Sequence, residues 1–322
     1  MPSPRKSAQQ KRALVLGCGG VAGAAWSIAA LDAVQRELRW DARKAEVLIG
    51  TSAGAVLAAL LGAGLSVERM LASQRGTVTD CIWDHERATG GAFPPRPALR
   101  FPAAKLLLQG LRGRLDPLTA AMGLLPQGRA DMRPFMQLID SAVPAGEWAP
   151  HPACWMMVVD AASGERVALG RDDAPAAPLN LAVCASYGVP GWCPPVQLSG
   201  RSFLDGGIAS PTSADFLLGS GVSEAIVLAP MASSEPDRPR SAAARIERCV
   251  RRHMTGIVDR EVAALRRAGI RVIRLEPGPQ DLAAIGYNMM DPGRRRQVFD
   301  TALHTTPVAV RQALSAAYDC AR

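Results

Sequence analysis

A serine between two glycines stands where one apolar run ends and another begins. The stretch VLIGTSAGAVLAAL (residues 47–60) holds Ser52 between Gly50 and Gly54. A Gly-x-Ser-x-Gly motif between a strand and a helix puts the serine on a sharp turn, because only residues without side chains let the two elements close on each other. The hydroxyl then stands at a helix N-terminus, where the dipole favours developing negative charge. The pattern predicts a nucleophile, and an ordinary glycine-bounded turn is the alternative.

A serine hydroxyl needs a base to react at neutral pH, and histidines are the first residues to consider. The chain has four of them, His85, His151, His253 and His304. A triad in the order serine, acid, histidine would have to use His253 or His304. Both lie in predicted helices rather than in a loop after a strand, so we expect both to be surface residues.

A carboxylate offers a different base. The stretch GRSFLDGGIASP places Asp205 at the end of a short apolar run and before Gly206 and Gly207. The two glycines let the backbone approach another loop closely. A partly desolvated carboxylate can accept a serine proton directly, because burial raises its pKa towards that of a working base. Asp-Gly is also common in hairpin turns, so the motif alone is weak.

A glycine-rich loop follows the first apolar run. Its sequence GCGGVAG (residues 17–23) fits G-x-G-G-x-x-G, which is similar to a dinucleotide-binding fingerprint. That fingerprint needs an acidic residue about 20 positions later, at the end of the second strand, to bind the ribose. Here the second strand ends in IGTSAG instead, which disfavours a nicotinamide-dependent oxidoreductase. Bare backbone N–H groups at a helix N-terminus suit an oxyanion hole.

Apolar periodicity predicts the elements that position these motifs. Strand and helix alternate twice within the first 61 residues, which is typical of a parallel sheet covered on both faces in an α/β fold. In the long predicted helix 242–268, one face is apolar and arginines occupy the other. The apolar face comprises Ile246, Val250, Ile257, Val258, Val262 and Leu265. Strands are predicted at 13–16, 46–49, 154–161, 166–169, 225–229 and 272–275, and helices at 24–38, 53–61, 131–140, 242–268 and 295–318.

These motifs together resemble the patatin-like phospholipases. LGCGGVAG, GTSAG and DGG follow in that family's order and spacing, and VVDAASGERV and CASYGVPGWCPPV are similar to its intervening segments, over residues 12–230. The resemblance implies a three-layer α/β/α sandwich with a mainly parallel central sheet. It implies a serine acyl hydrolase, of the lipase, phospholipase or esterase type, that cleaves fatty-acyl esters of lipids without cofactor or metal. The implied site has Ser52 as nucleophile, Asp205 as general base, and an oxyanion loop of Gly19 and Gly20 framed by Gly17 and Gly23.

The glycine loop departs from the family pattern at two positions. Ala22 stands where the family usually carries Lys or Arg, and Cys18 interrupts a run of glycines. The asparagine that often follows Asp-Gly-Gly is also absent. Loss of the positive charge could weaken oxyanion stabilisation. The alternative function is therefore a catalytically weak or inactive lipid-binding protein of the same fold.

Composition limits the partners. The net charge of +8 favours anionic partners, but no run of five basic residues occurs, so we expect an acyl-ester or lipid substrate and no nucleic acid. Peripheral contact with an anionic membrane is compatible with this charge. Seven cysteines without a C-x-x-C pair argue against disulfides and zinc and favour a reducing, cytoplasmic location. Glycines within the uncharged segment after KSAQQKR favour a strand and loop over a signal peptide.

The chain is predicted to form one domain over residues 12–322 after a disordered tail, 1–11. Residues 86–126 mix prolines with apolar fragments and are expected to be an insertion. It would be either a lid facing lipid or a segment packed on the core. Residues 242–322 are expected to be a C-terminal helical extension whose basic face is solvated rather than bound to a membrane. No oligomeric state is predicted.

Overall fold

The computed structural model describes residues 11–78, 92–235, 237–239 and 241–319. Almost all of the predicted tail, together with His85 and the first residues of the predicted insertion, lies outside these ranges. Among the described residues, no helix is both long and apolar enough to cross a membrane.

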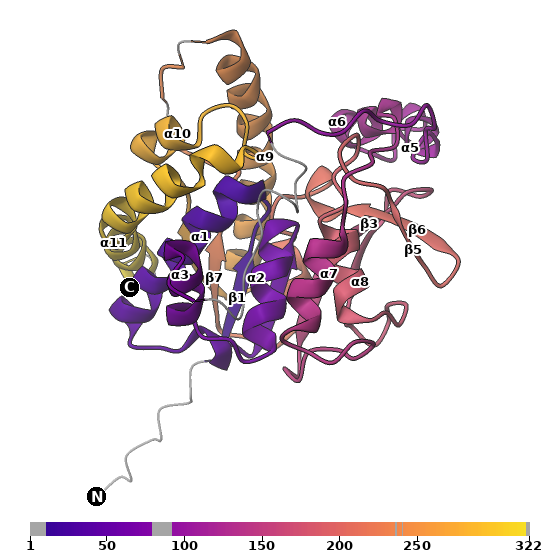
Figure 1. Ribbon diagram of the computed structural model, residues 1–322. Helices are drawn as coiled ribbons and strands as arrows, with labels where there is room; N and C mark the ends of the chain where they lie inside the picture. The colour runs from indigo at the N-terminus through magenta and orange to yellow at the C-terminus, as the bar shows by residue number, and fades with distance from the viewer. Residues whose placement is uncertain (1–10, 79–91, 236, 240, 320–322) are drawn as a thin grey trace, which may run out of the picture.

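A mixed sheet of eight strands forms the centre of the molecule (Figure 1). Its order is β5-β6-β3-β2-β1-β7-β8, and β4 also pairs with β3. The run β3-β2-β1-β7-β8 is parallel throughout, whereas β4, β5 and β6 pair in antiparallel fashion. The strands are β1 (Arg12–Leu16), β2 (Val47–Thr51), β3 (Cys154–Asp160), β4 (Arg166–Leu169), β5 (Val196–Leu198), β6 (Arg201–Asp205), β7 (Glu224–Leu228) and β8 (Arg271–Leu275).

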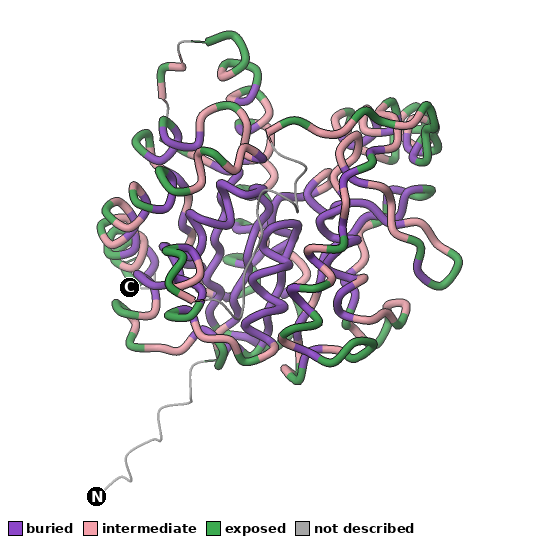
Figure 2. Tube along the Cα trace, viewed as in Figure 1, coloured by how far each residue is buried: buried purple, intermediate pink, exposed green. Residues whose placement is uncertain are grey.

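Alternating side chains let the sheet bury both faces. Leu14, Leu16 and Leu48 belong to one apolar core, whereas Val15 and Ile49 belong to a second core on the other face. The first core is covered by α1 (Gly20–Leu38), α2 (Ala53–Gly62), α3 (Val67–Arg75), α7 (Arg133–Asp140), α8 (Leu179–Ser186), α10 (Pro279–Ile285) and α11 (Arg295–Asp319). The second is covered by α9 (Ala242–Arg267) with the short 3₁₀ helix η4 (Ala214–Leu217). The predicted three-layer α/β/α arrangement is confirmed, and Figure 2 shows buried residues concentrated in the sheet, α1 and α2.

Most predicted elements differ from the observed ones only at their ends. Helix α1 begins at Gly20, inside the glycine loop. Strand β2 continues to Thr51, directly before Ser52. The start of α1 and the end of β2 therefore lie at the motifs they position. Some short elements have no predicted counterpart, because they contain too few residues to show an apolar periodicity. They are the hairpin β5–β6 and helices α3, α8 and α10. Residues 242–319 also do more than extend the domain: β8 forms an edge of the sheet and α11 packs along α1.

The predicted apolar face of α9 is wrong in one respect. Ile246 is 67% exposed, whereas Val258, Val262 and Leu265 are buried as expected. Polar residues share that buried face, namely Glu247, Arg251, Thr255 and Glu261. An arginine-rich helix therefore turns charged side chains towards the protein interior as well as towards solvent.

Candidate active site

Ser52 occupies a strained turn between β2 and α2. Its backbone has φ 57° and ψ −121°, a conformation that non-glycine residues rarely adopt. Neither neighbouring glycine has room for a side chain. A Cβ on Gly50 would lie 2.5 Å from Cα of Ala55, and one on Gly54 would lie 2.0 Å from the carbonyl oxygen of Leu16. The tight elbow predicted from the glycine spacing is thus a feature of the backbone itself.

Ser186, at the end of α8, holds this elbow in place. The Ser52 N–H donates to Oγ of Ser186 at 2.9 Å, and the Ser186 hydroxyl donates to the carbonyl oxygen of Met157 at 2.7 Å. Ser186 is completely buried. Sequence reasoning gave it no role, because a serine within an apolar helix has no local sign of a partner 134 residues away.

Strand β3 brings Ser52 and Asp205 together. Thr51, the last residue of β2, pairs with Met157, and Asp205, the last residue of β6, pairs with Val158. Because β2 runs parallel to β3 and β6 antiparallel to it, the carboxyl ends of β2 and β6 meet at consecutive residues of β3. In this arrangement the Ser52 side chain lies close enough to Asp205 to lower the pKa of its carboxyl group.

The Asp205 carboxyl group is buried, with 4% of the residue exposed. Burial, opposed in part by Ser52 and by a hydrogen bond from the Gly207 N–H, raises the pKa of Asp205 from 3.8 to about 7. The Gly207 bond is 2.7 Å long. The carboxyl group can therefore gain or lose a proton near neutral pH, which is what a general base requires.

The two glycines after Asp205 allow a close approach. A Cβ on Gly206 would lie 2.5 Å from the carbonyl oxygen of Met157, and one on Gly207 would lie 3.0 Å from Cβ of Cys18. Asp-Gly-Gly therefore packs directly against the glycine loop. The three predicted motifs meet at one end of the sheet.

Some backbone N–H groups of the glycine loop are hydrogen bonded within the fold, and others are not. Gly17 donates to the carbonyl oxygen of Leu228 at 2.9 Å, and Gly23 donates to that of Gly19 at 2.8 Å. Within the described parts of the chain, no group accepts a hydrogen bond from the N–H of Gly19 or Gly20. Gly20, at φ 58°, begins α1. Gly19 and Gly20 thus offer donors at a helix N-terminus, and Gly17 and Gly23 frame them.

Helix α9 supports this loop on one side through Arg251, which is 2% exposed. Its guanidinium group donates to the carbonyl oxygen of Pro230 at 2.5 Å and pairs with Glu247 at 2.7 Å. The Pro230 ring packs against the loop so closely that a Cβ on Gly19 would lie 2.9 Å from it.

Glu261 of α9 supports the loop on the other side. It accepts hydrogen bonds of 2.5 Å from both Ser210 Oγ and Thr212 Oγ1. Between those two residues, the carbonyl oxygen of Pro211 accepts from the Cys18 N–H at 2.8 Å. Two buried charged residues of α9 thus fix the two backbone segments that hold the loop.

Arg251 also places positive charge beside the loop. Its charge lowers the pKa of the Cys18 thiol, against the larger effect of burial, which raises it. Sequence reasoning missed Arg251, because an arginine in an arginine-rich helix is indistinguishable by pattern from its solvated neighbours.

We expect Arg251→Met to lower the free energy of unfolding by about 1–3 kcal/mol, because the buried Pro230 carbonyl loses its donor while Glu247 keeps Arg248 as a partner. Urea denaturation measures this change. Arg252→Met is the matched control, since Arg252 is the next residue on α9 and is exposed; it should change the free energy by no more than about 0.5 kcal/mol. Equal effects of the two substitutions would contradict a specific role for Arg251.

The histidines with described positions lie away from this arrangement. His253 pairs with Asp116 at 3.2 Å, and His304 is exposed, with Nδ1 2.7 Å from a carbonyl oxygen of its own helix. His151 contacts the carbonyl oxygen of Ala45. The expectation that His253 and His304 lie at the surface agrees with these positions.

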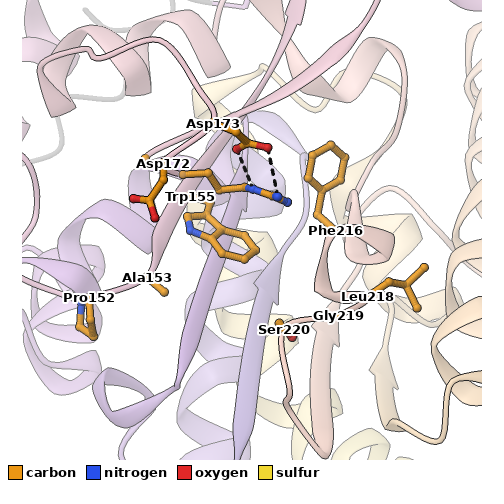
Figure 3. A pocket seen from close by; sticks show the side chains of 11 residues that line it. Pro152, Ala153, Trp155, Asp172, Asp173, Phe216, Leu218, Gly219 and Ser220 are labelled. Atoms are coloured by element: carbon orange, nitrogen blue, oxygen red, sulfur yellow. Dashed lines mark hydrogen bonds and ion pairs between the residues drawn. The ribbon is translucent and has the colours of Figure 1, made fainter.

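A cavity of about 490 Å³ lies at the opposite end of the sheet (Figure 3). It is lined by residues before β3, after β4 and before β7, so it opens at the amino ends of the parallel strands. Trp155 and Phe216 form walls, and the guanidinium group of Arg171 lies over both rings while pairing with Asp173. The guanidinium group of Arg171 is thus already paired with a carboxylate. The cavity lies away from Ser52. Within the described ranges, no cluster of three or more His, Cys, Asp or Glu side chains could hold a metal ion.

Comparison with known proteins matches most of the chain to a family model. The model of the family described as patatin-like phospholipase matches residues 14–218. Among solved structures, the chain is similar to VipD from Legionella pneumophila, with a TM-score of 0.46 and 14% sequence identity over 95% of this chain and 68% of that chain. No curated protein sequence matches significantly.

Proposed function

Because the chain belongs to the patatin-like phospholipase family, we propose that it is a serine acyl hydrolase that cleaves fatty-acyl esters of lipids. The observation that carries the proposal is the register of β2 and β6 along β3, which brings Ser52, on its strained elbow, beside the buried Asp205. The open N–H groups of Gly19 and Gly20 on the neighbouring loop add the third element that acyl transfer needs.

The proposed reaction has two halves. In the first, Asp205 takes the hydroxyl proton of Ser52, and Oγ attacks the ester carbonyl carbon. The amides of Gly19 and Gly20 donate to the oxyanion, Asp205 returns the proton to the leaving alcohol, and an acyl-enzyme remains. In the second half, Asp205 takes a proton from water, which attacks the acyl group. Asp205 then gives that proton to Oγ of Ser52, so the serine hydroxyl is restored as the fatty acid leaves.

A carboxylate can perform this work alone because of its surroundings. An exposed aspartate is too weak a base at neutral pH, but burial brings the pKa of Asp205 to about 7. The strained Ser52 backbone aims the hydroxyl at this carboxyl group, and Ser186 fixes that backbone by its hydrogen bond. The proposed chemistry uses side chains and backbone amides alone.

The alternative function, lipid binding without hydrolysis, rests on Ala22. That residue is fully buried, and its N–H donates to the carbonyl oxygen of Met289 at 3.0 Å. Arg251 of α9 does place a guanidinium group beside the loop, but Glu247 pairs with it. We favour the hydrolase because the strained elbow, the buried Asp205 and the open amides of Gly19 and Gly20 support it, whereas the alternative rests on position 22 alone.

Labelling with a fluorophosphonate probe tests the proposal. We expect one adduct per molecule, on the peptide that contains Ser52, because an activated serine attacks the phosphorus of the probe. Denatured protein is the control and should stay unlabelled. Folded protein without an adduct on Ser52 would contradict the proposal. If lipid extracted from that protein were identified by mass spectrometry, the lipid-binding alternative would replace it.

A further inference from the structure

Exposed apolar side chains gather on one projecting segment, residues 98–126, here called the arm. It contains α5 (Lys105–Leu111), α6 (Pro117–Ala121) and the 3₁₀ helix η2 (Met122–Leu124), and it stands out from the sheet in Figure 1. Five of the eleven large apolar side chains exposed among the described residues belong to the arm: Leu99, Phe101, Leu108, Leu111 and Leu124. Leu99 is 92% exposed and Leu111 is 87% exposed. Figure 2 shows this segment mostly exposed or intermediate.

The arm is a folded structure and not a loose loop. Leu106 of α5 is fully buried and belongs, with Ala103, to a small core that includes Leu204 of β6. A Cβ on Gly110 would lie 2.4 Å from Cβ of Ala120, so α5 and α6 are in direct contact. Helix α5 therefore buries one apolar face and leaves Leu108 and Leu111 in solvent. Exposed apolar side chains that gather on one segment are typical of an interaction surface.

Two contacts fix the arm beside the candidate site. Thr119 Oγ1 donates to the carbonyl oxygen of Ile208 at 2.8 Å. Ile208 ends the 3₁₀ helix η3 (Gly206–Ile208) that directly follows Asp205. Asp116 pairs with His253 of α9 at 3.2 Å. A surface that binds the arm would thus lie next to the catalytic carboxylate.

The charge of the arm indicates what that surface is. Arg100, Lys105, Arg112 and Arg114 are exposed, and Asp116 is the one acidic residue of the segment. Exposed leucines among basic side chains match the interface of a bilayer, where apolar groups enter the acyl region and cations meet anionic headgroups. A second copy of this chain would bring the same cations together, which disfavours self-association.

We infer that the arm docks the protein onto the surface of an anionic phospholipid bilayer and so presents the Ser52 site to lipid esters. This inference rests on the proposed function for its second half, whereas docking itself can be measured independently. The arm lies on the bilayer without spanning it. The basic residues select anionic lipid, and the leucines supply the apolar contact.

Co-sedimentation with vesicles tests the inference. The vesicles contain either phosphatidylcholine alone or phosphatidylcholine with phosphatidylglycerol. We expect the full chain to bind the mixed vesicles more tightly, and the double substitution Leu99→Ser with Leu111→Ser to weaken that binding by at least about tenfold. Arg112→Gln should weaken binding to the mixed vesicles by about fivefold and leave binding to pure phosphatidylcholine unchanged.

Ile246→Ser is the matched control, because Ile246 is an exposed apolar residue of α9 outside the arm; it should bind as the unsubstituted chain does. Unchanged vesicle binding by the Leu99→Ser, Leu111→Ser chain would overturn the inference. The inference would also be overturned if neither the unsubstituted protein nor the Leu99→Ser, Leu111→Ser variant bound vesicles, and the two substitutions converted a dimer into a monomer.

A ratio of rates separates this inference from the proposed function. We expect the rate on esters in vesicles, relative to the rate on a soluble short-chain ester, to fall about tenfold in the arm variant. If no ester is hydrolysed, the proposed function fails while vesicle binding still decides the docking inference. If both esters are hydrolysed with an unchanged ratio, the inference that docking presents the Ser52 site to lipid esters fails while the proposed function stands.

Discussion

Replacing Ser52 by alanine is expected to reduce the turnover of a short-chain p-nitrophenyl ester by about 10³-fold or more. The substitution removes the only atom that can form the acyl-enzyme at this elbow, and nucleophile removal costs at least that much in serine hydrolases. The Asp205 carboxyl group and the amides of Gly19 and Gly20 remain in the variant. Purified protein, assayed for initial rates at saturating ester, measures the loss.

Backbone strain at position 52 needs its own control, because alanine at φ 57° is as strained as serine. Ser199 has φ 48° and is exposed in the turn between β5 and β6. Ser199→Ala therefore reproduces the same type of change away from the site and should keep the full rate. A Ser52→Ala protein that melts like its parent but hydrolyses the ester at a similar rate would show that another nucleophile is responsible.

The candidate site could be predicted from the sequence where a local pattern fixes the backbone. Positions 50 and 54 require glycine, because a Cβ on Gly50 or Gly54 would clash with the adjacent helix or strand. A requirement of this kind is visible in the sequence as a motif. The proximity of Ser52 to Asp205 depends instead on the register of β2 and β6 along β3. No pattern within one segment contains that register, so the sequence supplied it only through the family resemblance.

Long-range polar contacts could not be predicted from the sequence for the same reason. Ser186, Arg251 and Glu261 act on the elbow and on the glycine loop from other parts of the chain. Arg251 and Glu261 interrupt the apolar periodicity of α9, and a pattern method assigns such residues to the solvent side. The position of Ile246 shows the converse error, since an apolar residue at helical spacing is exposed near the beginning of α9. Periodicity locates a helix better than it identifies the buried polar residues on it.

The pH dependence of the reaction should reflect the raised pKa of Asp205, which burial brings to about 7. Only the carboxylate form can take the serine proton, so kcat/KM is expected to rise about tenfold per pH unit below this value and to level off above it. Asp205→Asn should lower the rate by about 10²–10⁴-fold and abolish this limb of the profile. A rate profile between pH 5 and pH 9, in a constant ionic strength buffer, measures both effects (the limits are set roughly two units either side of the pKa).

The titration of Asp205 should also make the free energy of unfolding depend on pH, because its pKa differs between the folded and unfolded states. The folded pKa of Asp205, about 7, lies above its ordinary value of 3.8. Between these values the folded state binds more protons than the unfolded state, so the free energy of unfolding falls as pH rises through this window. Asp205→Asn should remove that contribution, whereas Asp281→Asn, at a buried carboxyl group that accepts from Thr305, should leave the activity limb in place. An Asp205→Asn protein that keeps both the rate and its dependence on pH would assign the base to another residue. Loss of the rate together with a flatter stability profile would place both effects on one carboxyl group, because burial that makes Asp205 a base at neutral pH also makes its ionised form costly to the fold.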